Sequence, residues 1–543
     1  MTDLKNNNDN CPPSDSKKSA KPNAKSLTKS LSIATAIMMG SVLLSRITGL
    51  IREQVLAYYG GTTSQMDAYV IAFFIPELLN HFLAGGFLSI TFIPIFQKHL
   101  LEGNRVRAWN SLSNLLTTGS LLFIILIPLT MLFTPSSLKL MGKMSSDPSQ
   151  LALVSHLTRI ILPAQIFFYW GAFFSAVQMA EHKFFLPAMA PLCYNFGIII
   201  CGLVLGPIIG IEGFAWGVLI GAFVGNVVIQ LPGAVKSGMR FTPTINFSDP
   251  DLITYVKKTI PLILGIGMVF SNEIFFRFFG SYLPEGATSS INYALRTMLI
   301  VVAVFGQASG VAFFPFLSKM ALEKQFEKMS DMLHSILLKI AIYLLPLSGI
   351  MFVLANQIIS ILYEHGHFNS ESVSKTASVF SIYLFGTFSF SASMIIARTF
   401  YALQNTLLPM LISTAISIIT IPLYMVFSTF LGPQGIALAA VIGMTLQLLT
   451  LYFFWINTFK LWEKSKIFIW QFTKIILICS CGVIVGLILK NFIQPHIFFE
   501  TKLMQNFSIC MIVSIPSLLI TFAIYELTGV QSIRTTLRGF RRK

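Results

Sequence analysis

Three arginines stand inside or at the start of apolar stretches of this sequence, where a charged side chain is costly. Arg46 lies more than ten residues from either end of its stretch, Arg52 follows six residues later, and Arg296 opens another stretch. An ionisable group at membrane depth costs about 2.5–3.5 kcal/mol on insertion scales, so it should face a cavity or a partner. Guanidinium groups bind phosphate oxygens in bidentate fashion. We therefore expect these residues to bind an anionic group.

Each of these arginines also has a structural alternative. Arg46 could form an ion pair, Arg52 could extend to the membrane interface, and Arg296 could anchor a helix end at that interface. Glu53 follows Arg46 by seven residues, which returns to nearly the same helical face. The spacing predicts one polar stripe shared by Arg46 and Glu53.

The remaining charges at membrane depth read differently. Glu273 and Arg277 are four residues apart, a spacing that predicts a self-neutralised pair on one helix. Asp67 opens an expected helix, where an acid serves either as a helix cap or in function.

Enzyme motifs do not compete with this interpretation. The sequence has no Walker A loop, no HExxH and no GxSxG, and its carboxylates are too dispersed to form an acid–base pair. His365 and His367 have the spacing of metal ligands, but two such histidines are typically solvated loop residues. We expect no catalytic residue, no metal site and no cofactor, and the identity of any coupling ion stays open. A membrane-embedded enzyme acting on polyprenyl phosphates and a non-transporting scaffold are the alternatives from other classes.

Composition indicates what must position these side chains. Hydrophobic residues make up 54% of the 543 residues and charged residues only 11%, whereas a soluble domain carries about 25% charged residues. Apolar stretches of this length cross a bilayer as helices, since backbone amides in lipid must be satisfied within the segment. The fold class expected is an all-α integral membrane protein. About fourteen helices are predicted, at 31–57, 66–97, 110–133, 151–178, 184–206, 211–233, 255–279, 290–317, 332–356, 376–402, 407–430, 434–457, 468–489 and 504–527.

The basic residues predict the orientation of these helices. With fourteen helices and a cytoplasmic N-terminus, 25 lysines and arginines lie in cytoplasmic segments and five in outer loops. That distribution follows the positive-inside rule and places both termini in the cytoplasm. The net charge of +16 is therefore a topology signal, and no nucleic acid partner is expected. Residues 1–30 are predicted to be a disordered tail and 531–543 a basic tail.

An internal repeat divides the predicted helices. Phe92–Lys98 is echoed by Phe313–Lys319 at an offset of 221, and Gly210 and Gly213 are echoed by Gly432 and Gly435 at 222. Six helices per repeat give both copies the same orientation, with a substrate site between the lobes. We expect a first lobe at 31–240, a second lobe at 252–460, and helices 13 and 14 at 467–530 as an appendage.

Several motifs resemble those of the MurJ (MviN) lipid II flippases. Ser45-Arg46-Ile-Thr-Gly49-Leu-Ile-Arg52-Glu53 resembles their SRxxGxxRD, and Asp67-Ala-Tyr69 resembles the motif that follows. Leu283-Pro-Glu-Gly286, Asn292-Tyr-Ala-Leu-Arg296 and Ala397-Arg398-Thr-Phe-Tyr-Ala-Leu-Gln404 resemble three further stretches of the family. The similarity runs from about residue 31 to 460.

The resemblance implies the fold of the multidrug/oligosaccharidyl-lipid/polysaccharide exporter superfamily. It implies transport of lipid II, an undecaprenyl-pyrophosphate-linked disaccharide-peptide, to the periplasmic leaflet of the bacterial inner membrane by alternating access. The cavity arginines of the family map to Arg46, Arg52 and Arg296, and helices 13 and 14 would border a groove for the lipid tail, among membrane lipids. A flippase for another polyprenyl-pyrophosphate-linked oligosaccharide, or a multidrug antiporter, is the alternative within the superfamily.

One motif departs from the family. Its helix 2 carries a pair of arginines where this sequence has Asn80 and His81. One cavity arginine is therefore missing. The hypothesis is that His81 or Arg277 replaces its charge, with Glu53, Asp67 and Glu273 as supporting acids.

Overall fold

The computed structural model describes residues 24–83, 87–139, 147–181, 183–264, 268–497 and 499–529, and throughout these ranges the regular structure is helical. In chain order the α-helices are α1 (Ala24–Gly60), α2 (Ser64–Ala72), α3 (Phe74–Leu83), α4 (Phe87–Leu101), α5 (Arg105–Leu138), α6 (Pro148–Ile161), α7 (Ala164–Ala180), α8 (Phe185–Ile209), α9 (Glu212–Phe223), α10 (Gln230–Lys236), α11 (Pro250–Leu264), α12 (Met268–Gly280), α13 (Ala287–Val302), α14 (Ala308–Leu322), α15 (Phe326–Val353), α16 (Ala355–Tyr363), α17 (Ser370–Ala402), α18 (Leu407–Phe459), α19 (Trp462–Ile493) and α20 (Lys502–Leu527). Short π-helical turns, η2 (Val224–Val228) and η3 (Ala303–Gln307), join α9 to α10 and α13 to α14.

The predicted helical segments are all helical in the structure. Ten stretches are long and apolar enough to cross a membrane, and one of them, α18, covers two of the predicted segments. The predicted N-terminal tail was drawn too long, because α1 already begins at Ala24. The last seven residues of that tail include Ala24, Lys25 and Leu27, which favour helix. The other tail, 531–543, lies outside the described residues.

The second predicted segment is broken, as its length required. The break between α2 and α3 falls at Phe73, three residues before Pro76. Proline has no amide hydrogen to donate to the carbonyl four residues earlier, which is that of Ala72. The hydroxyl of Thr158 donates to this carbonyl instead, at 3.2 Å. The second predicted bend, at Gly85 and Gly86, lies outside the described residues.

Two glycines of the sequence repeat share one backbone conformation. Gly210 ends α8 with φ 62° and ψ −139°, and Gly432 interrupts α18 with φ 59° and ψ −134°. This region of backbone space is open essentially to glycine alone. The repeat at an offset of 222 therefore extends from residue type to backbone geometry at this pair.

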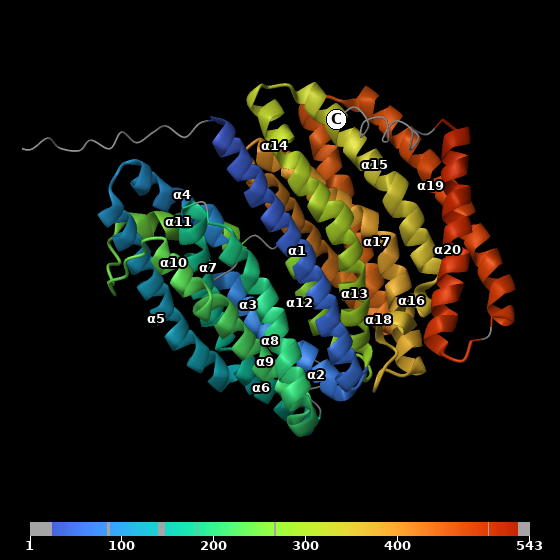
Figure 1. Cartoon of the computed structure of the whole chain (residues 1–543), viewed down its shortest axis with the longest axis horizontal. Coiled ribbons are helices and arrows are strands. Elements are labelled where there is room, and N and C mark those ends of the chain that lie inside the picture. The colour runs from blue at the N-terminus through green and yellow to red at the C-terminus, as the bar shows by residue number, and fades with distance from the viewer. Residues whose placement is uncertain are drawn as a thin grey trace, which may run out of the picture.

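The helices pack as two bundles with α1 between them. Figure 1 shows α3–α11 on the left and α13–α20 on the right. Within the first bundle (α1–α11) α1 packs on α8 and α2 on α6, while within the second (α12–α18) α13 packs on α17 and α12 on α18. The last two helices, α19 and α20, pack on each other and cover α15 and α16.

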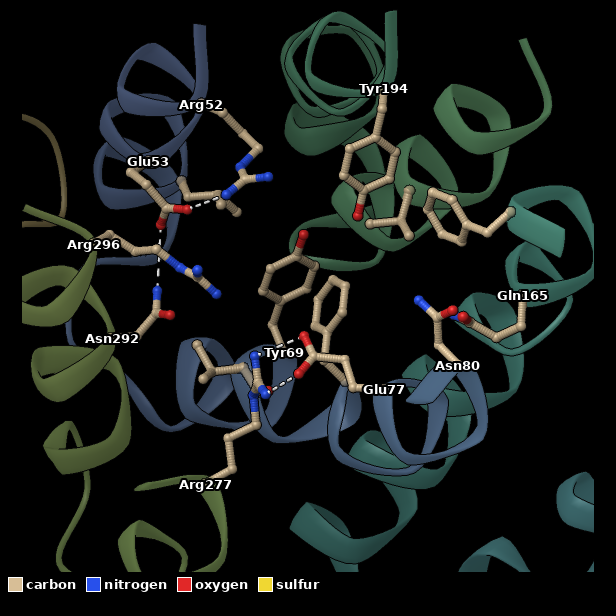
Figure 2. Close-up of a pocket in the computed structure, with 15 residues that line it drawn as sticks. Arg52, Glu53, Tyr69, Glu77, Asn80, Gln165, Tyr194, Arg277, Asn292 and Arg296 are labelled. Carbon is tan, nitrogen blue, oxygen red and sulfur yellow. Dashed lines mark hydrogen bonds and ion pairs between the residues drawn. The ribbon is translucent and has the colours of Figure 1, made fainter. Parts of the chain in front are cut away.

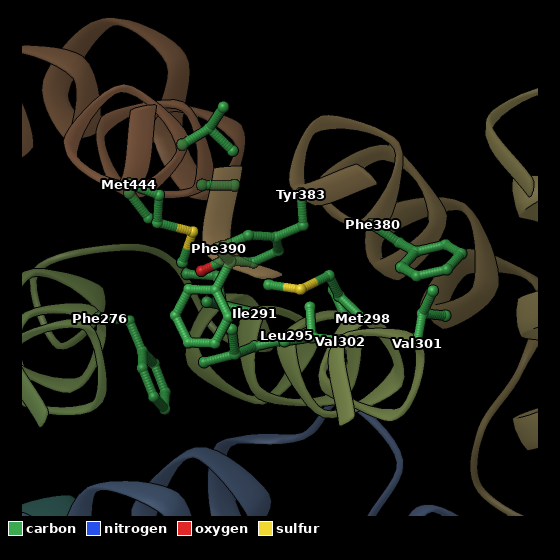
Figure 3. Packing of buried hydrophobic residues seen from close by; sticks show 14 of the residues in the cluster. Phe276, Ile291, Leu295, Met298, Val301, Val302, Phe380, Tyr383, Phe390 and Met444 are labelled. Atoms are coloured by element: carbon green, nitrogen blue, oxygen red, sulfur yellow. The ribbon is translucent and has the colours of Figure 1, made fainter. Parts of the chain in front are cut away.

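One face of α13 builds the core of the second bundle. Ile291, Leu295, Met298 and Val302 are buried at helical spacing against aromatic side chains of α17. Figure 3 shows this face beside Phe380, Tyr383 and Phe390. Burying it turns the opposite face of α13, which carries Asn292 and Arg296, toward the first bundle.

Candidate functional site

Two adjoining cavities lie between the bundles. They have open volumes of about 860 and 660 Å³ and share Arg52, Glu53 and Arg296 in their walls. The second bundle contributes Arg277, Asn292 and Arg296 to the larger cavity. The first bundle supplies the rest of that wall, namely Arg52, Glu53, Leu56, Tyr69, Val70, Phe73, Glu77, Asn80, Gln165, Phe168, Tyr194 and Val218.

Arg46 lines the smaller cavity from the middle of α1. Its guanidinium donates to the side-chain oxygen of Gln307 at 3.2 Å. Gln307 closes the π-helical turn η3 of the second bundle, and such turns are frequent at functional sites. No acid lies within ion-pair distance of Arg46 in the part of the chain that the structure describes. The side chain is exposed to the cavity.

Arg52 and Glu53 form a pair with neighbours from both bundles. Their side chains lie 2.5 Å apart, and Arg52 also donates to the side-chain oxygen of Asn195 at 3.1 Å. Glu53 accepts a longer hydrogen bond, 3.3 Å, from Asn292 of α13. The predicted stripe on α1 thus holds to the extent that Arg46 and Glu53 line one cavity, but the partner of Glu53 is its neighbour Arg52.

A second ion-pair network crosses the larger cavity. Arg296 lies 2.9 Å from Glu273, which also contacts Arg277 at 3.1 Å, so the predicted pair on α12 is present. Arg277 binds both carboxylate oxygens of Glu77 and donates to the carbonyl of Val70 at 3.0 Å. Figure 2 shows Arg277 against Glu77, with Arg52 and Arg296 pointing into the space opposite Tyr194.

The balance of charge around the cavities is positive. Arg52 is paired with Glu53, while Arg277 and Arg296 share Glu77 and Glu273. Arg46 supplies a further positive charge that the described acids leave unpaired. The walls therefore hold four arginines against three carboxylates, which favours an anionic ligand.

The two residues of the divergent helix 2 motif have different surroundings. Asn80 lines the larger cavity, near Gln165. His81 stacks on Phe270 with ring centroids 3.9 Å apart and is absent from the described walls of both cavities. Arg277 does line the larger cavity, but its side chain is only 2% exposed. The geometry thus brings Arg277 and Asn80 to the site and leaves His81 beside it.

Asp67 acts as a helix cap, and the helix belongs to the other bundle. Its carboxylate accepts hydrogen bonds from the backbone amides of Gly286 and Ser289, both at 2.7 Å, at the start of α13. In return Glu285 accepts from the amide of Ser64, the first residue of α2, at 2.7 Å. Asp67 is therefore a contact between the bundles and not part of the cavity wall described here.

Further contacts close the same end of the cleft. The backbone amide of His367 donates to the carbonyl of Tyr58 at 2.9 Å, and the hydroxyls of Thr62 and Ser372 lie 2.7 Å apart. Gly61 has φ 53°, and a Cβ there would lie 2.5 Å from the carbonyl oxygen of His367. The bundles thus meet tightly where α1 ends.

Three polar residues of the site carried no motif. Asn195 lies 5% exposed in α8 and holds Arg52, while Gln307 holds Arg46. Glu77 pairs with Arg277 across 200 residues of sequence. The available signal was that each stands within an apolar stretch, where a polar side chain is expected to have a partner.

The fold is that of a known transporter. A solved structure described as "Lipid II flippase MurJ, inward closed conformation" superposes with a TM-score of 0.74 at 24% identity, covering 91% of this chain and all of that one. An inward-facing multidrug resistance MATE family transporter of the MOP superfamily superposes with a TM-score of 0.64 at 14% identity, over 79% of this chain and 99% of its own. At these identities the likeness establishes the fold alone.

The family is decided by sequence. The model of the family described as "Lipid II flippase MurJ" matches residues 56–508. The chain belongs to the MurJ family. "Lipid II flippase MurJ" of Burkholderia cenocepacia is 27% identical over 431 residues, which cover 77% of this chain and 82% of that protein. "Probable lipid II flippase MurJ" of Buchnera aphidicola subsp. Acyrthosiphon pisum is 29% identical over 374 residues, covering 68% and 72%.

Membership of the MurJ family makes the chain a transporter rather than an enzyme. It also agrees with the ten apolar helical stretches, which make the chain a membrane protein. The MurJ resemblance seen in the motifs of α1 and α13 is thereby confirmed.

Proposed function

We propose that this MurJ protein carries lipid II from the cytoplasmic to the periplasmic leaflet of a bacterial inner membrane. The observation that carries the proposal is the excess of arginine in a cavity between two bundles, with Arg46 unpaired by any described acid. A pyrophosphate placed there would accept charge-assisted hydrogen bonds from the guanidinium groups.

Exposure separates the arginines that can reach a ligand from one that cannot. Arg52 and Arg296 have side chains 19% and 28% exposed, and Arg46 is more open still. These three are the proposed headgroup ligands. Arg277, held by Glu77, Glu273 and a backbone carbonyl, is proposed as a positioning residue that fixes α3 against α12.

The closed end of the cleft gives the direction. The contacts around Asp67 and Thr62 lie where α1 ends, at the end of α1 opposite the predicted cytoplasmic N-terminus. With that orientation the outer side is sealed and the headgroup enters from the cytoplasm. Exchange with the opposite state requires these contacts to break.

The proposed moving units follow the repeat. They are 31–240 and 252–460, linked through α11 and α12, with 467–530 as a border for the polyprenyl tail. Apolar side chains on α19 and α20 remain open to lipid, among them Ile484, Ile488 and Ile515. The tail would stay in the bilayer beside these helices while the sugar-peptide crosses in the polar cavity.

The test is complementation of depletion in the native cell. Depleting the protein should cause lysis with lipid II accumulating in the inner leaflet, and the wild-type gene should restore growth. Arg46→Gln should fail to restore it, and the purified variant should bind lipid II on the order of tenfold to a hundredfold more weakly, as expected for loss of a charged hydrogen-bond donor.

The matched control is Arg159→Gln. Arg159 is another arginine of a membrane helix, and it donates to the carbonyl of Met131 away from both cavities. It should restore growth. Normal cell-wall synthesis on depletion, with loss of another surface polysaccharide, would instead assign the transporter to a different polyprenyl-pyrophosphate-linked oligosaccharide.

A further inference from the structure

The segment between α10 and α11 lies as an extended strap (residues 241–247) along the outside of α5. Backbone amides at alternate positions bind α5, with Thr242 on the hydroxyl of Ser113 at 3.2 Å and Asn246 on the side chain of Asn114 at 2.8 Å. The intervening side chains Phe241, Ile245 and Phe247 are 45%, 49% and 68% exposed. The strap is therefore polar toward α5 and apolar toward its surroundings.

Ion pairs fix the end of the strap. Arg107 of α5 contacts Asp249 at 2.7 Å and Asp251 at 2.8 Å, and Asp251 also contacts His99 of α4 at 3.0 Å. These contacts set the first turn of α11 beside the first turn of α5. The strap and α11 are thus held as a fixed wall.

An apolar groove with an open volume of about 1050 Å³ runs between this wall and α5. Phe247 of the strap stands in its lining together with residues of α5, α7 and α11, namely Leu115, Thr118, Gly119, Leu121, Leu122, Phe123, Ile125, Tyr169, Leu252, Tyr255, Val256, Thr259 and Ile260. None of these residues lines the described walls of the two inter-bundle cavities. The groove is a separate feature of the first bundle.

Cations stand beside the apolar lining. Ile253, Val256, Lys257 and Ile260 share one exposed stripe of α11 by their spacing, and Lys258 is exposed next to it. Among the described residues no acid lies within ion-pair distance of either lysine. Lys257 is six residues beyond the contact of Asp251 with Arg107, or roughly 9 Å along the helix. The α5 wall continues to Ile125, roughly 27 Å beyond Arg107.

We propose that this groove binds an anionic glycerophospholipid of the cytoplasmic leaflet. The headgroup phosphate contacts Lys257 and Lys258, and one acyl chain lies along Leu121, Leu122 and Ile125. Positive charge near the membrane surface attracts anionic lipids, and the exposed aromatic side chains of the strap suit the interfacial region. A zwitterionic lipid offers the same chain without the net charge, and it should bind more weakly.

The test compares lipids retained by the purified full-length protein in native mass spectrometry. The protein is presented with equal amounts of phosphatidylglycerol and phosphatidylcholine carrying the same acyl chains. We expect a preference for phosphatidylglycerol that falls on the order of fivefold for each lysine replaced in Lys257→Gln and Lys258→Gln. Ile260→Trp, which fills the groove, should reduce retention of both lipids.

Matched variants decide between this site and general charge or bulk. The pair Lys319→Gln and Lys328→Gln removes two exposed lysines of the second bundle, and Ile484→Trp adds a ring to an exposed position of α19. Both should leave retention unchanged. Equal losses in these controls would overturn the proposal, as would displacement of the phospholipid by undecaprenyl phosphate, because the groove would then belong to the substrate.

Discussion

The carboxylate of Asp67 lies 2.7 Å from the backbone nitrogen of Ser289, although the two residues are 222 positions apart. Asp67 belongs to α2 of the first bundle and Ser289 to the first turn of α13 in the second. An N-terminal helical amide has no partner within its own helix. The cap that α13 lacks locally is therefore supplied by the other bundle, and it exists only while the bundles meet.

Asp67→Ala should favour opening of the outer end. Losing a helix cap costs typically about 1 kcal/mol, and this cap is present only in the closed state. A single cysteine at Thr62, in a background without other cysteines, should react with a membrane-impermeant maleimide on the order of fivefold faster.

The control for this effect is Asp147→Ala. Asp147 caps α6 through the amide of Ser149 at 2.9 Å, within the first bundle. Its loss should lower the unfolding temperature without changing the reactivity at position 62. Equal reactivity in the Asp67 and Asp147 variants would show that the cap does not govern opening.

Gly286→Ala should also prevent the outer end from closing. Gly286 has φ 81°, and a Cβ there would lie 2.5 Å from the carbonyl oxygen of Thr62 in the other bundle. The expected result is raised maleimide reactivity at the outer end. Gly103→Ala carries similar backbone strain, with φ 74°, but has nothing within 4 Å of the added Cβ. If both substitutions raised reactivity alike, backbone strain and not the close approach would be responsible.

Arg277→Ala should destabilise the protein more than Arg46→Ala. Removing one partner of a buried ion pair costs about 3–5 kcal/mol, because the remaining charges stay buried and unpaired. Glu77 and Glu273 would be left in that state, whereas Arg46 has Gln307 as its partner. Thermal unfolding in detergent measures the difference. Adding Glu77→Gln and Glu273→Gln to Arg277→Ala should recover part of the loss; no recovery would contradict the ion-pair explanation.

The attachment of α20 should weaken in acid. Partial burial raises the pKa of Glu364, but hydrogen bonds from Lys502, Ser360 and Ser370 outweigh it and leave the pKa below its ordinary value. A lowered carboxyl pKa stabilises the fold above the ordinary pKa of glutamate, and that contribution is lost as the pH falls through the lowered value. Hydrogen exchange at the start of α20 should therefore be slow at neutral pH and accelerate several-fold below about pH 4.

Glu364→Gln tests this assignment. It should make exchange at the start of α20 faster at neutral pH and nearly independent of pH. Glu371→Gln removes a nearby acid whose partner is Lys375, at 2.8 Å. That variant should keep the wild-type pH profile, and a flat profile from it would assign the effect elsewhere.

Local pattern was sufficient for much of this protein. The apolar stretches predicted every membrane helix, because a chain in lipid must satisfy its backbone within each segment. The four-residue spacing predicted the contact of Glu273 with Arg277, and the echo of Gly210 at Gly432 predicted a shared backbone geometry. Each of these depends on interactions within a few residues or on direct repetition of sequence.

Partners across the bundles were decided by tertiary structure. The sequence placed Arg46 and Glu53 on one stripe, but packing gave Arg46 to Gln307 and left Glu53 with Arg52 and Asn292. It offered His81 as a cavity charge, but stacking on Phe270 holds that ring beside the site.

The physical reason is the range of the interactions. Helical periodicity fixes which face of a helix a residue occupies, but not which other helix packs on that face. Asp67 was a helix cap by its local pattern, yet the helix it caps begins 220 residues later, at Ala287. Only the packing of the two bundles brings such groups within hydrogen-bond distance.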